Sequence, residues 1–283
     1  MKKILVPTDF SPNSMRAVDY AVKVAKKNDA AVYLVHTIDV PDMNQEFMPP
    51  PDGSYNMKEK EEALKKLENL RQSIEDTEQL LVNTLLYHGN VTDNILKAAK
   101  EYAVDIIIMG TLGITGLADK IFGTHTASVI SHSETPVLAI PLEYEWSRPS
   151  RLLLAINHFD EGTDILFPVF DIAAIFDAEV RVVVFTDEDS AGSADYMEHA
   201  RNIVEAGKQL KDVYKGISVI PQHISGHQFM ETMNEYIDSN QVDLLAMTTH
   251  RRSLVSSIFK KSITRKMSYQ SKVPVLAIPI PNP

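Results

Sequence analysis

Residues 136–141 read Pro-Val-Leu-Ala-Ile-Pro, and the same six residues recur unchanged at positions 274–279. The two copies are 138 residues apart, and at that spacing the apolar run at residues 104–109 is matched by residues 242–247. A repeat of this length indicates a duplicated domain, because solenoid repeats are typically about 20 to 50 residues long. The chain is therefore expected to consist of two related halves.

The duplication predicts two domains separated by a short linker. We place the first domain at residues 1–143 and the second at residues 150–283, because Trp146, Arg148 and Pro149 lie between two apolar segments there. A chain of 283 residues has the length of about two domains. Each half is long enough to bury a core of its own.

Each half alternates short apolar segments with amphipathic ones, which is the pattern of an α/β fold. In the first half we expect strands at residues 3–6, 31–36, 81–87, 105–109 and 136–140. Helices are expected between them at residues 11–26, 58–79, 92–102 and 123–131. The strands of the second half are expected at residues 152–156, 180–185, 217–222, 242–247 and 275–278. Apolar runs without alternation are typical of parallel strands covered on both faces. The predicted fold class is two tandem doubly wound parallel five-stranded sheets, each with helices on both faces.

The composition narrows the classes of function. A net charge of −10 disfavours binding to nucleic acid and to anionic membranes. The chain has no cysteine, which excludes disulfides, thiolate nucleophiles and cysteine-ligated metals. No segment approaches the roughly 20 apolar residues of a membrane-spanning helix, and the first residues do not resemble a signal peptide. We therefore expect a cytoplasmic protein with neither nucleic acid nor membrane as a partner.

A glycine-rich segment follows the fourth expected strand of the first half. Gly110 and Gly113 come directly after that strand, and Gly123-Thr124 opens the next helix. Ligands of open parallel sheets bind beyond the carboxyl ends of the strands, and a helix N-terminus favours anions. Glycine also allows backbone to approach a ligand closely. The spacing fits a polyphosphate site, although glycines at strand ends are also common in α/β proteins for structural reasons alone.

The pattern Gly110-x2-Gly113-x9-Gly123-Thr124 resembles the ATP-binding motif of the universal stress protein family. Residues 3–11 resemble the first strand and turn of that family, and residues 34–39 resemble the end of its second strand. The resemblance covers the first half from end to end and the second half more loosely. It implies a tandem member with a Rossmann-like fold of the adenine nucleotide alpha-hydrolase type.

The resemblance also implies which residues bind the nucleotide. They are Pro7, Thr8, Asp9, Thr37, Met109, Gly110, Gly113, Gly123 and Thr124. The three glycines and Thr124 would hold the ribose and phosphates, residues 7–9 would line the nucleoside end, and Thr37 would contact adenine through its backbone. The implied cofactor is ATP, with or without Mg²⁺, and Asp9 is the candidate ligand for the metal ion. Both Asp9 and Thr124 have helix N-caps as their alternative role.

The second half has lost the glycine motif. Residues 248–262, at the matching place, contain no glycine, and Asn157 stands at or close to the position of Asp9. A Cβ where backbone must approach a phosphate should block binding. Basic residues in this segment form either an anion patch or a solvated helix face; they are Arg251, Arg252, Lys260 and Lys261.

The sequence is compatible with three functions. The leading hypothesis is an ATP-binding regulatory module of a stress response, with one nucleotide in the first half and no catalytic residues. The second is a slow ATPase or nucleotidyl-transfer enzyme, for which Asp9 would have to serve as base. The third is an interaction protein that binds no nucleotide.

The histidines do not indicate a metal site. His36 is expected to be structural, and Gly226 between His223 and His227 favours a turn over a metal site.

The two identical apolar segments predict how the halves pack. Single-domain relatives in the family usually pair through their final strand, so the resemblance implies an intrachain pseudo-dimer. We expect residues 137–140 to pair antiparallel with residues 275–278, which would close two apolar sheet edges at once. Loosely tethered halves, a domain-swapped dimer and a further homodimer remain alternatives, and the protein partner stays unknown.

Overall fold

The computed structural model describes residues 1–38, 54–111, 124–156, 162–189, 191–250 and 271–280. The elements of the first half are β1 (Lys3–Pro7), α1 (Pro12–Asn28), β2 (Ala31–Ile38), α2 (Ser54–Glu78), β3 (Val82–His88), α3 (Val91–Glu101), β4 (Ile106–Gly110), α4 (Thr124–His132) and β5 (Val137–Ile140). Those of the second half are β6 (Arg151–Ile156), the 3-10 helix η1 (Asp164–Leu166), α5 (Phe167–Phe176), β7 (Glu179–Asp187), α6 (Ser193–Val213), β8 (Val219–Gly226), α7 (Phe229–Asn240), β9 (Leu244–His250) and β10 (Val275–Ile280).

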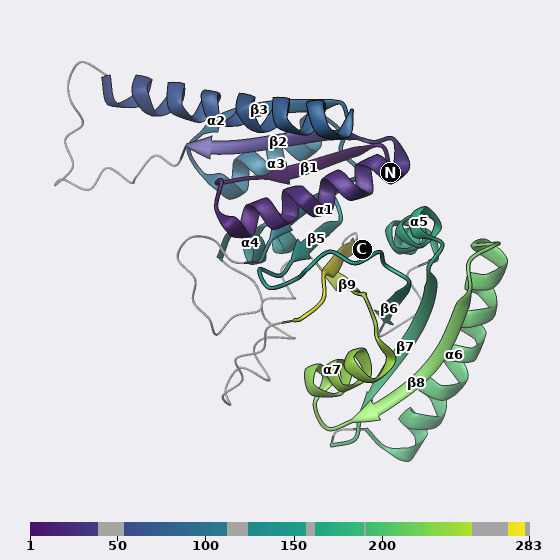
Figure 1. The fold of residues 1–283 in the computed structure, drawn as a ribbon. Helices are drawn as coiled ribbons and strands as arrows, with labels where there is room; N and C mark the ends of the chain where they lie inside the picture. The colour runs from purple at the N-terminus through teal and green to yellow at the C-terminus, as the bar shows by residue number, and fades with distance from the viewer. Residues whose placement is uncertain (39–53, 112–123, 157–161, 190, 251–270, 281–283) are drawn as a thin grey trace, which may run out of the picture.

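The two expected sheets are joined into one ten-stranded sheet (Figure 1). Its strand order is β3-β2-β1-β4-β5-β10-β9-β6-β7-β8, so the second half repeats the order of the first in reverse. Pairing is parallel within each half, and β5 and β10 pair antiparallel at the centre, with Leu138 opposite Leu276. The predicted fold class and the predicted pairing of the final strands are both confirmed.

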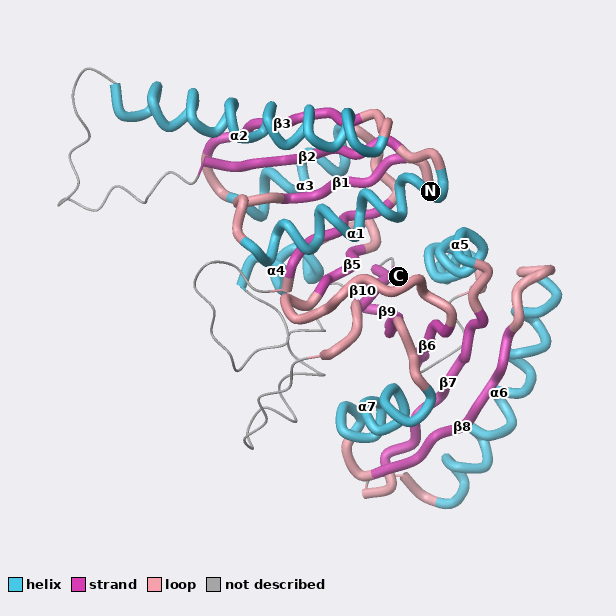
Figure 2. Tube along the Cα trace, in the orientation of Figure 1, coloured by secondary structure: helices cyan, strands magenta, loops and turns pink. Residues whose placement is uncertain are grey.

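Helices cover both faces of this sheet (Figure 2). The cluster on one face takes side chains from α1, α2, α5 and α6, and the cluster on the other takes them from α3, α4 and α7. Ile4 faces the first cluster and Leu5 the second, and both are fully buried. Burial on both faces explains why these strands are apolar throughout rather than alternating. Each cluster runs through both halves, so the halves share their core.

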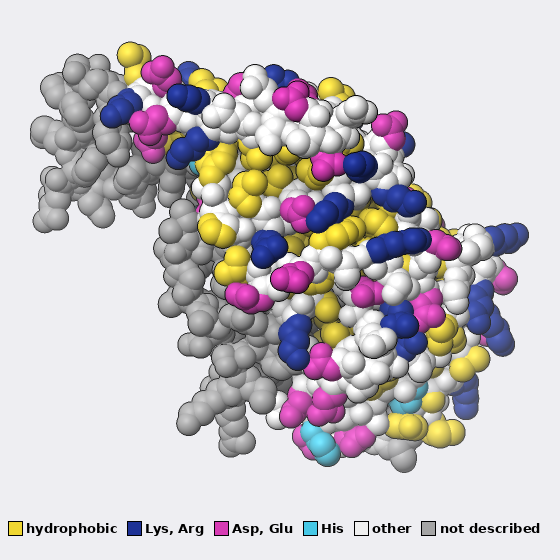
Figure 3. Space-filling view, in the orientation of Figure 1, with side chains coloured by type: hydrophobic (Ala, Val, Ile, Leu, Met, Phe, Trp, Pro, Cys, Tyr) yellow, Lys and Arg dark blue, Asp and Glu magenta, His cyan; other side chains and the backbone are white. Residues whose placement is uncertain are grey.

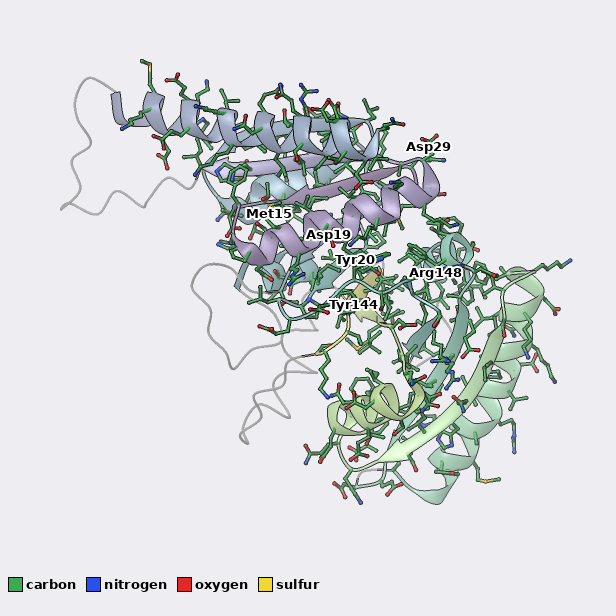
Figure 4. The ribbon with its side chains drawn as sticks, in the orientation of Figure 1. Met15, Asp19, Tyr20, Asp29, Tyr144 and Arg148 are labelled. Atoms are coloured by element: carbon green, nitrogen blue, oxygen red, sulfur yellow. The ribbon has the colours of Figure 1, made fainter. Side chains whose placement is uncertain are left out.

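The segment between β5 and β6 packs against helices α1 and α5. The Trp146 ring lies edge-on to Tyr20 of α1, with ring centroids 4.7 Å apart, and 5.8 Å from Phe176 of α5. The guanidinium of Arg148 donates from Nε to the carbonyl of Phe176 at 3.1 Å. Figure 4 shows Tyr20, Tyr144 and Arg148 at this junction. The connecting segment therefore fastens α1 of one half to α5 of the other.

Charged side chains of both signs are mixed over the face drawn in Figure 3. On α2, Arg71 lies between two carboxylates and makes ion pairs with Glu68 and Glu75, both at 2.5 Å. Among the described residues, no helix combines the length and the apolar character needed to cross a membrane.

Several element boundaries differ from those expected, and two of the differences concern residues discussed above. The second strand extends to Ile38, two residues beyond the expected end, because it keeps pairing with β3 up to His88. The third strand of the second half extends to Gly226, where a parallel partner on β7 continues to Asp187. His223 therefore lies in a strand and not in a turn.

Candidate functional site

The turn after β1 is held by a compact set of hydrogen bonds. Thr8 is buried, and its amide donates to the carbonyl of Val35 on the neighbouring strand at 2.9 Å. The Thr8 hydroxyl oxygen accepts from the amide of Phe10 at 3.1 Å and lies 3.2 Å from the hydroxyl of Ser14. A turn fixed at both ends in this way holds the intervening Asp9 in one place.

Asp9 carries an ionised carboxylate on this turn. Its Oδ1 accepts from the amide of Ser11 at 3.0 Å. Partial burial raises the pKa of Asp9, but hydrogen bonds from Ser11 and Ser14 lower it by more, so the pKa of this carboxyl lies below its ordinary value. The N-cap of α1 is Ser11, whose hydroxyl oxygen accepts from the amide of Ser14 at 3.2 Å. Asp9 is therefore not the N-cap of α1.

His36 connects the second strand to the same turn. Its Nδ1 lies 2.7 Å from the carbonyl oxygen of Thr8, and because a carbonyl can only accept, Nδ1 carries the proton. The ring of Phe10 packs on His36 with centroids 4.8 Å apart, and Lys66 Nζ lies 5.6 Å from the Phe10 ring. Phe10 has φ 61°, a left-handed conformation that is strained for a residue with a side chain. The structural role expected of His36 agrees with this arrangement.

The end of β4 meets the start of α1 at Gly110. A Cβ on Gly110 would lie 2.5 Å from Asn13 Nδ2 and 2.8 Å from the backbone oxygen of Asn13, distances that real side chains do not reach. Gly110 does not have a positive φ. Its carbonyl accepts from the hydroxyl of Thr126 in α4 at 2.7 Å. The glycine is thus required by the helix that packs on it, a reason that the sequence did not reveal.

The structure brings six of the nine predicted residues to one edge of the sheet. Because β2, β1 and β4 are adjacent and parallel, their carboxyl ends lie side by side. This edge holds Pro7, Thr8, Asp9, Thr37, Met109 and Gly110. Met109 is 5% exposed and packs in the core, which leaves only its backbone for a ligand. Thr124 is the first residue of α4, and Gly113 and Gly123 lie outside the described residues.

Three further residues at this edge were missed by sequence reasoning. Asn13, Ser14 and Thr126 are all buried beside the turn after β1 or the end of β4. Helical periodicity identifies an apolar stripe, and polar residues in a first turn carry no signal that they face inward. Only the placement of α1 and α4 on the sheet reveals them.

The second half differs at the corresponding edge. Thr248 pairs with Ile278 as Gly110 pairs with Ile140, so a threonine takes the place of the glycine. Asn157 and most of the segment at residues 248–262, including its four basic residues, lie outside the described residues. Of the second-half positions that correspond to the three motif glycines, the structure describes one, in β9, and it is a threonine.

Two histidines of the second half share one hydroxyl. The buried Thr186 of β7 has its Oγ1 2.7 Å from His199 Nδ1 and 2.8 Å from His223 Nε2. The ring of Tyr196 lies edge-on to His223, with centroids 4.3 Å apart. Burial, and then the nearby His199, lower the pKa of His223. Within the described part of the chain, no three His, Cys, Asp or Glu residues are grouped to hold a metal ion.

Comparison with known proteins agrees with this architecture. The model of the universal stress protein family matches residues 1–141 and again residues 149–279. Universal stress protein MJ0531 of Methanocaldococcus jannaschii is 32% identical over 146 residues, which cover 49% of this chain and 81% of the relative. Universal stress protein MJ0577 of the same organism is 32% identical over 157 residues, which cover 49% of this chain and 94% of the relative.

A solved structure shares the fold over the whole chain. The crystal structure of a universal stress protein from Archaeoglobus fulgidus has a TM-score of 0.73 to this chain at 18% sequence identity. The match covers 99% of this chain and 98% of the other. The family model thus matches each half separately, and the known structure matches both halves together. The chain belongs to the universal stress protein family, as a tandem member.

Proposed function

We propose that the first half of this protein binds ATP and that the chain acts as a nucleotide-dependent regulatory module. The observation that carries the proposal is the edge where β2, β1 and β4 end together, because the fixed turn at Asp9 lies there beside the start of the glycine motif. Open α/β sheets bind ligands at such an edge. We take residues 1–143 as the nucleotide-binding domain and residues 150–283 as its degenerate partner.

Each group at this edge suits one part of the nucleotide. The ionised carboxylate of Asp9 can accept from ribose hydroxyls or hold a phosphate-bound Mg²⁺. The segment from Gly110 to Thr124 leads into the N-terminus of α4, where backbone N–H groups and the helix dipole favour phosphate. The backbone of Thr37, near the end of β2, would contact adenine. Pro7 and Thr8 would line the nucleoside end.

The electrostatics of Asp9 favour binding over catalysis. A general base works best with a pKa near the working pH, and the hydrogen bonds to Asp9 move its pKa in the opposite direction. A carboxylate stabilised in this way is a good ligand for hydroxyls and cations but a poor acceptor of a proton from water. We therefore propose at most weak hydrolysis of the bound ATP, in a cytoplasmic protein.

Calorimetric titration with ATP, with and without Mg²⁺, tests the proposal. We expect close to one nucleotide per chain. The variant Gly113→Val should remove binding, because a branched side chain would fill the space where backbone meets phosphate. Arg251→Val, at the corresponding place of the second half, is the matched control and should leave binding unchanged. A stoichiometry near two would show that the second half is also functional, and no binding by the wild type would contradict the proposal.

A further inference from the structure

Among the described residues, six other than glycine have a left-handed backbone with positive φ. Five of them lie within two residues of a helix C-terminus, where this conformation is a common cap; they are Asp29, Gln79, Ala103, Asp177 and Gln241. The sixth is Phe10, with φ 61°, which instead precedes Ser11, the N-cap of α1. A bulky residue is strained in this conformation, so its neighbours must hold it there.

His36 of β2 holds the chain on both sides of Asp9. Its Nδ1 donates to the carbonyl of Thr8, the residue before Asp9, at 2.7 Å. Its ring packs on the ring of Phe10, the residue after Asp9, with centroids 4.8 Å apart. From α2, Lys66 Nζ lies 5.6 Å from the centroid of the Phe10 ring. One side chain on the neighbouring strand thus contacts both residues that flank Asp9.

The carboxylate of Asp9 lies between these two contacts and stays accessible. Asp9 is exposed, whereas Thr8 before it is buried. The Oδ1 of Asp9 accepts from the amide of Ser11, so the side chain as well as the backbone has a defined place. Without the contacts of His36, Phe10 could return to the ordinary region of negative φ, which would turn the peptide group between Asp9 and Phe10. The carboxylate would then lose its fixed position.

We propose that His36 is a positioning residue for nucleotide binding, which keeps the Asp9 carboxylate where it meets a ribose hydroxyl or a phosphate-bound Mg²⁺. The assignment rests on the proposed binding of ATP at this edge. A group that is ordered before its ligand arrives costs less entropy on binding, so His36 raises the affinity without touching the ligand. Its effect on binding must therefore depend on the carboxylate of Asp9, a dependence that a purely structural role does not require.

Calorimetric titration of the full chain with ATP and Mg²⁺ tests this dependence through a double-mutant cycle. His36→Leu, which loses both contacts, should weaken ATP binding about 10-fold, and Asp9→Asn should weaken it by a similar factor. The double variant should bind little worse than Asp9→Asn alone, because the carboxylate that His36 positions is then absent. His36→Asn places an amide N–H where the imidazole carries Nδ1, so its affinity should stay within about threefold of the wild type.

His132→Leu is the matched control. The Nδ1 of His132 lies 2.8 Å from a backbone carbonyl oxygen, much as that of His36 does. His132 is the last residue of α4, about 12 Å along the helix from Thr124. Its substitution should leave the affinity for ATP unchanged.

The titrations separate the role of His36 from the proposed function. Unchanged affinity in His36→Leu, or the same loss from His36→Leu with and without the Asp9 carboxylate, would overturn the role of His36 and leave ATP binding standing. An affinity of Asp9→Asn equal to that of the wild type would do the same. No ATP binding by the wild type would overturn both. If His36→Leu does not fold, His36→Gln replaces it, because the longer side chain carries its amide away from Thr8.

Discussion

The carboxyl edges of the two halves are built on the same strands and carry different chemistry. In the first half, Ile38 of β2 and Leu86 of β3 are apolar, and by strand register the equivalent positions of the second half are Thr186 of β7 and His223 of β8. The interiors of the central strands remain buried and apolar in both halves, as at Ile4–Val6 of β1 and Leu152–Leu154 of β6, which are all 0% exposed. The fold constrains the interior of the sheet, whereas the edge was free to diverge.

The helix that follows the first strand shows the same contrast. In the first half α1 spans 17 residues, begins at Pro12 and packs so closely that position 110 must be glycine. In the second half the equivalent helix α5 spans 10 residues and follows a 3-10 turn, and Thr248 takes the glycine's place. Among the described residues, a glycine required by close approach of this helix to the strand end is found in the first half and not in the second. It coincides with the half that we propose binds ATP.

The largest effect is expected at the junction that both halves share. Leu276→Lys would place an ammonium in the centre of the sheet opposite Leu138, at a position that is 0% exposed. We expect a loss of unfolding free energy above about 4 kcal/mol, measured by urea denaturation. Leu81→Lys, at a position 66% exposed, is the control and should change stability by less than about 0.5 kcal/mol. A small effect of Leu276→Lys would mean that the halves do not pair in solution.

The next largest loss of stability is expected at the end of β4, where the first half has Gly110 and the second half has Thr248. Gly110→Ala should lower the free energy of unfolding by about 1–3 kcal/mol, because α1 must shift to admit the new Cβ. Thr248→Ala, the counterpart in β9, should cost less than about 1 kcal/mol. Adding Asn13→Ala to Gly110→Ala should recover only part of the loss, since the backbone oxygen of Asn13 also lies within 2.8 Å. Equal costs for the two single substitutions would remove the contrast between the halves.

A smaller effect is expected from the histidine pair of the second half. The pKa of His223 is lowered below its usual 6.5 by burial and by His199. The unfolded chain then binds this proton more readily, so stability falls as pH drops below about 6.5 and through the lowered pKa. His223→Gln should therefore lose less melting temperature than the wild type between about pH 7 and pH 5. An identical pH dependence in both proteins would contradict the shift.

The smallest effect is expected at His227 and has the opposite sign. The hydrogen bond that His227 donates to the carboxylate of Asp189, together with the charges of Asp189 and Glu188, raises the pKa of His227. The resulting stability is fully present below about pH 6.5 and is lost as pH rises through the raised pKa. His227→Gln should lower the melting temperature at pH 6 and not at pH 9, by no more than about 1 °C, because the side chain is 69% exposed. A larger loss at pH 9 would reverse the sign of the shift.

Local signals made much of the fold predictable. The repeated apolar segments predicted the central pairing, and the amphipathic pattern at residues 11–26 predicted α1, because both signals depend on residues close in sequence. The tandem family membership followed from the glycine motif and the duplication. The glycine segment itself, at residues 112–123, lies outside the described residues, so its phosphate contacts remain a prediction.

The sequence by itself thus determined the duplication, the parallel sheets, the family and the edge at which a ligand would bind. Only the tertiary structure decided that Asn13 lies on Gly110, that His36 holds the turn at Thr8, and that Thr186 joins two histidines. These contacts join residues that lie on different elements and far apart in the chain. They depend on how closely a helix or strand approaches its neighbour, which the pattern of one segment does not record.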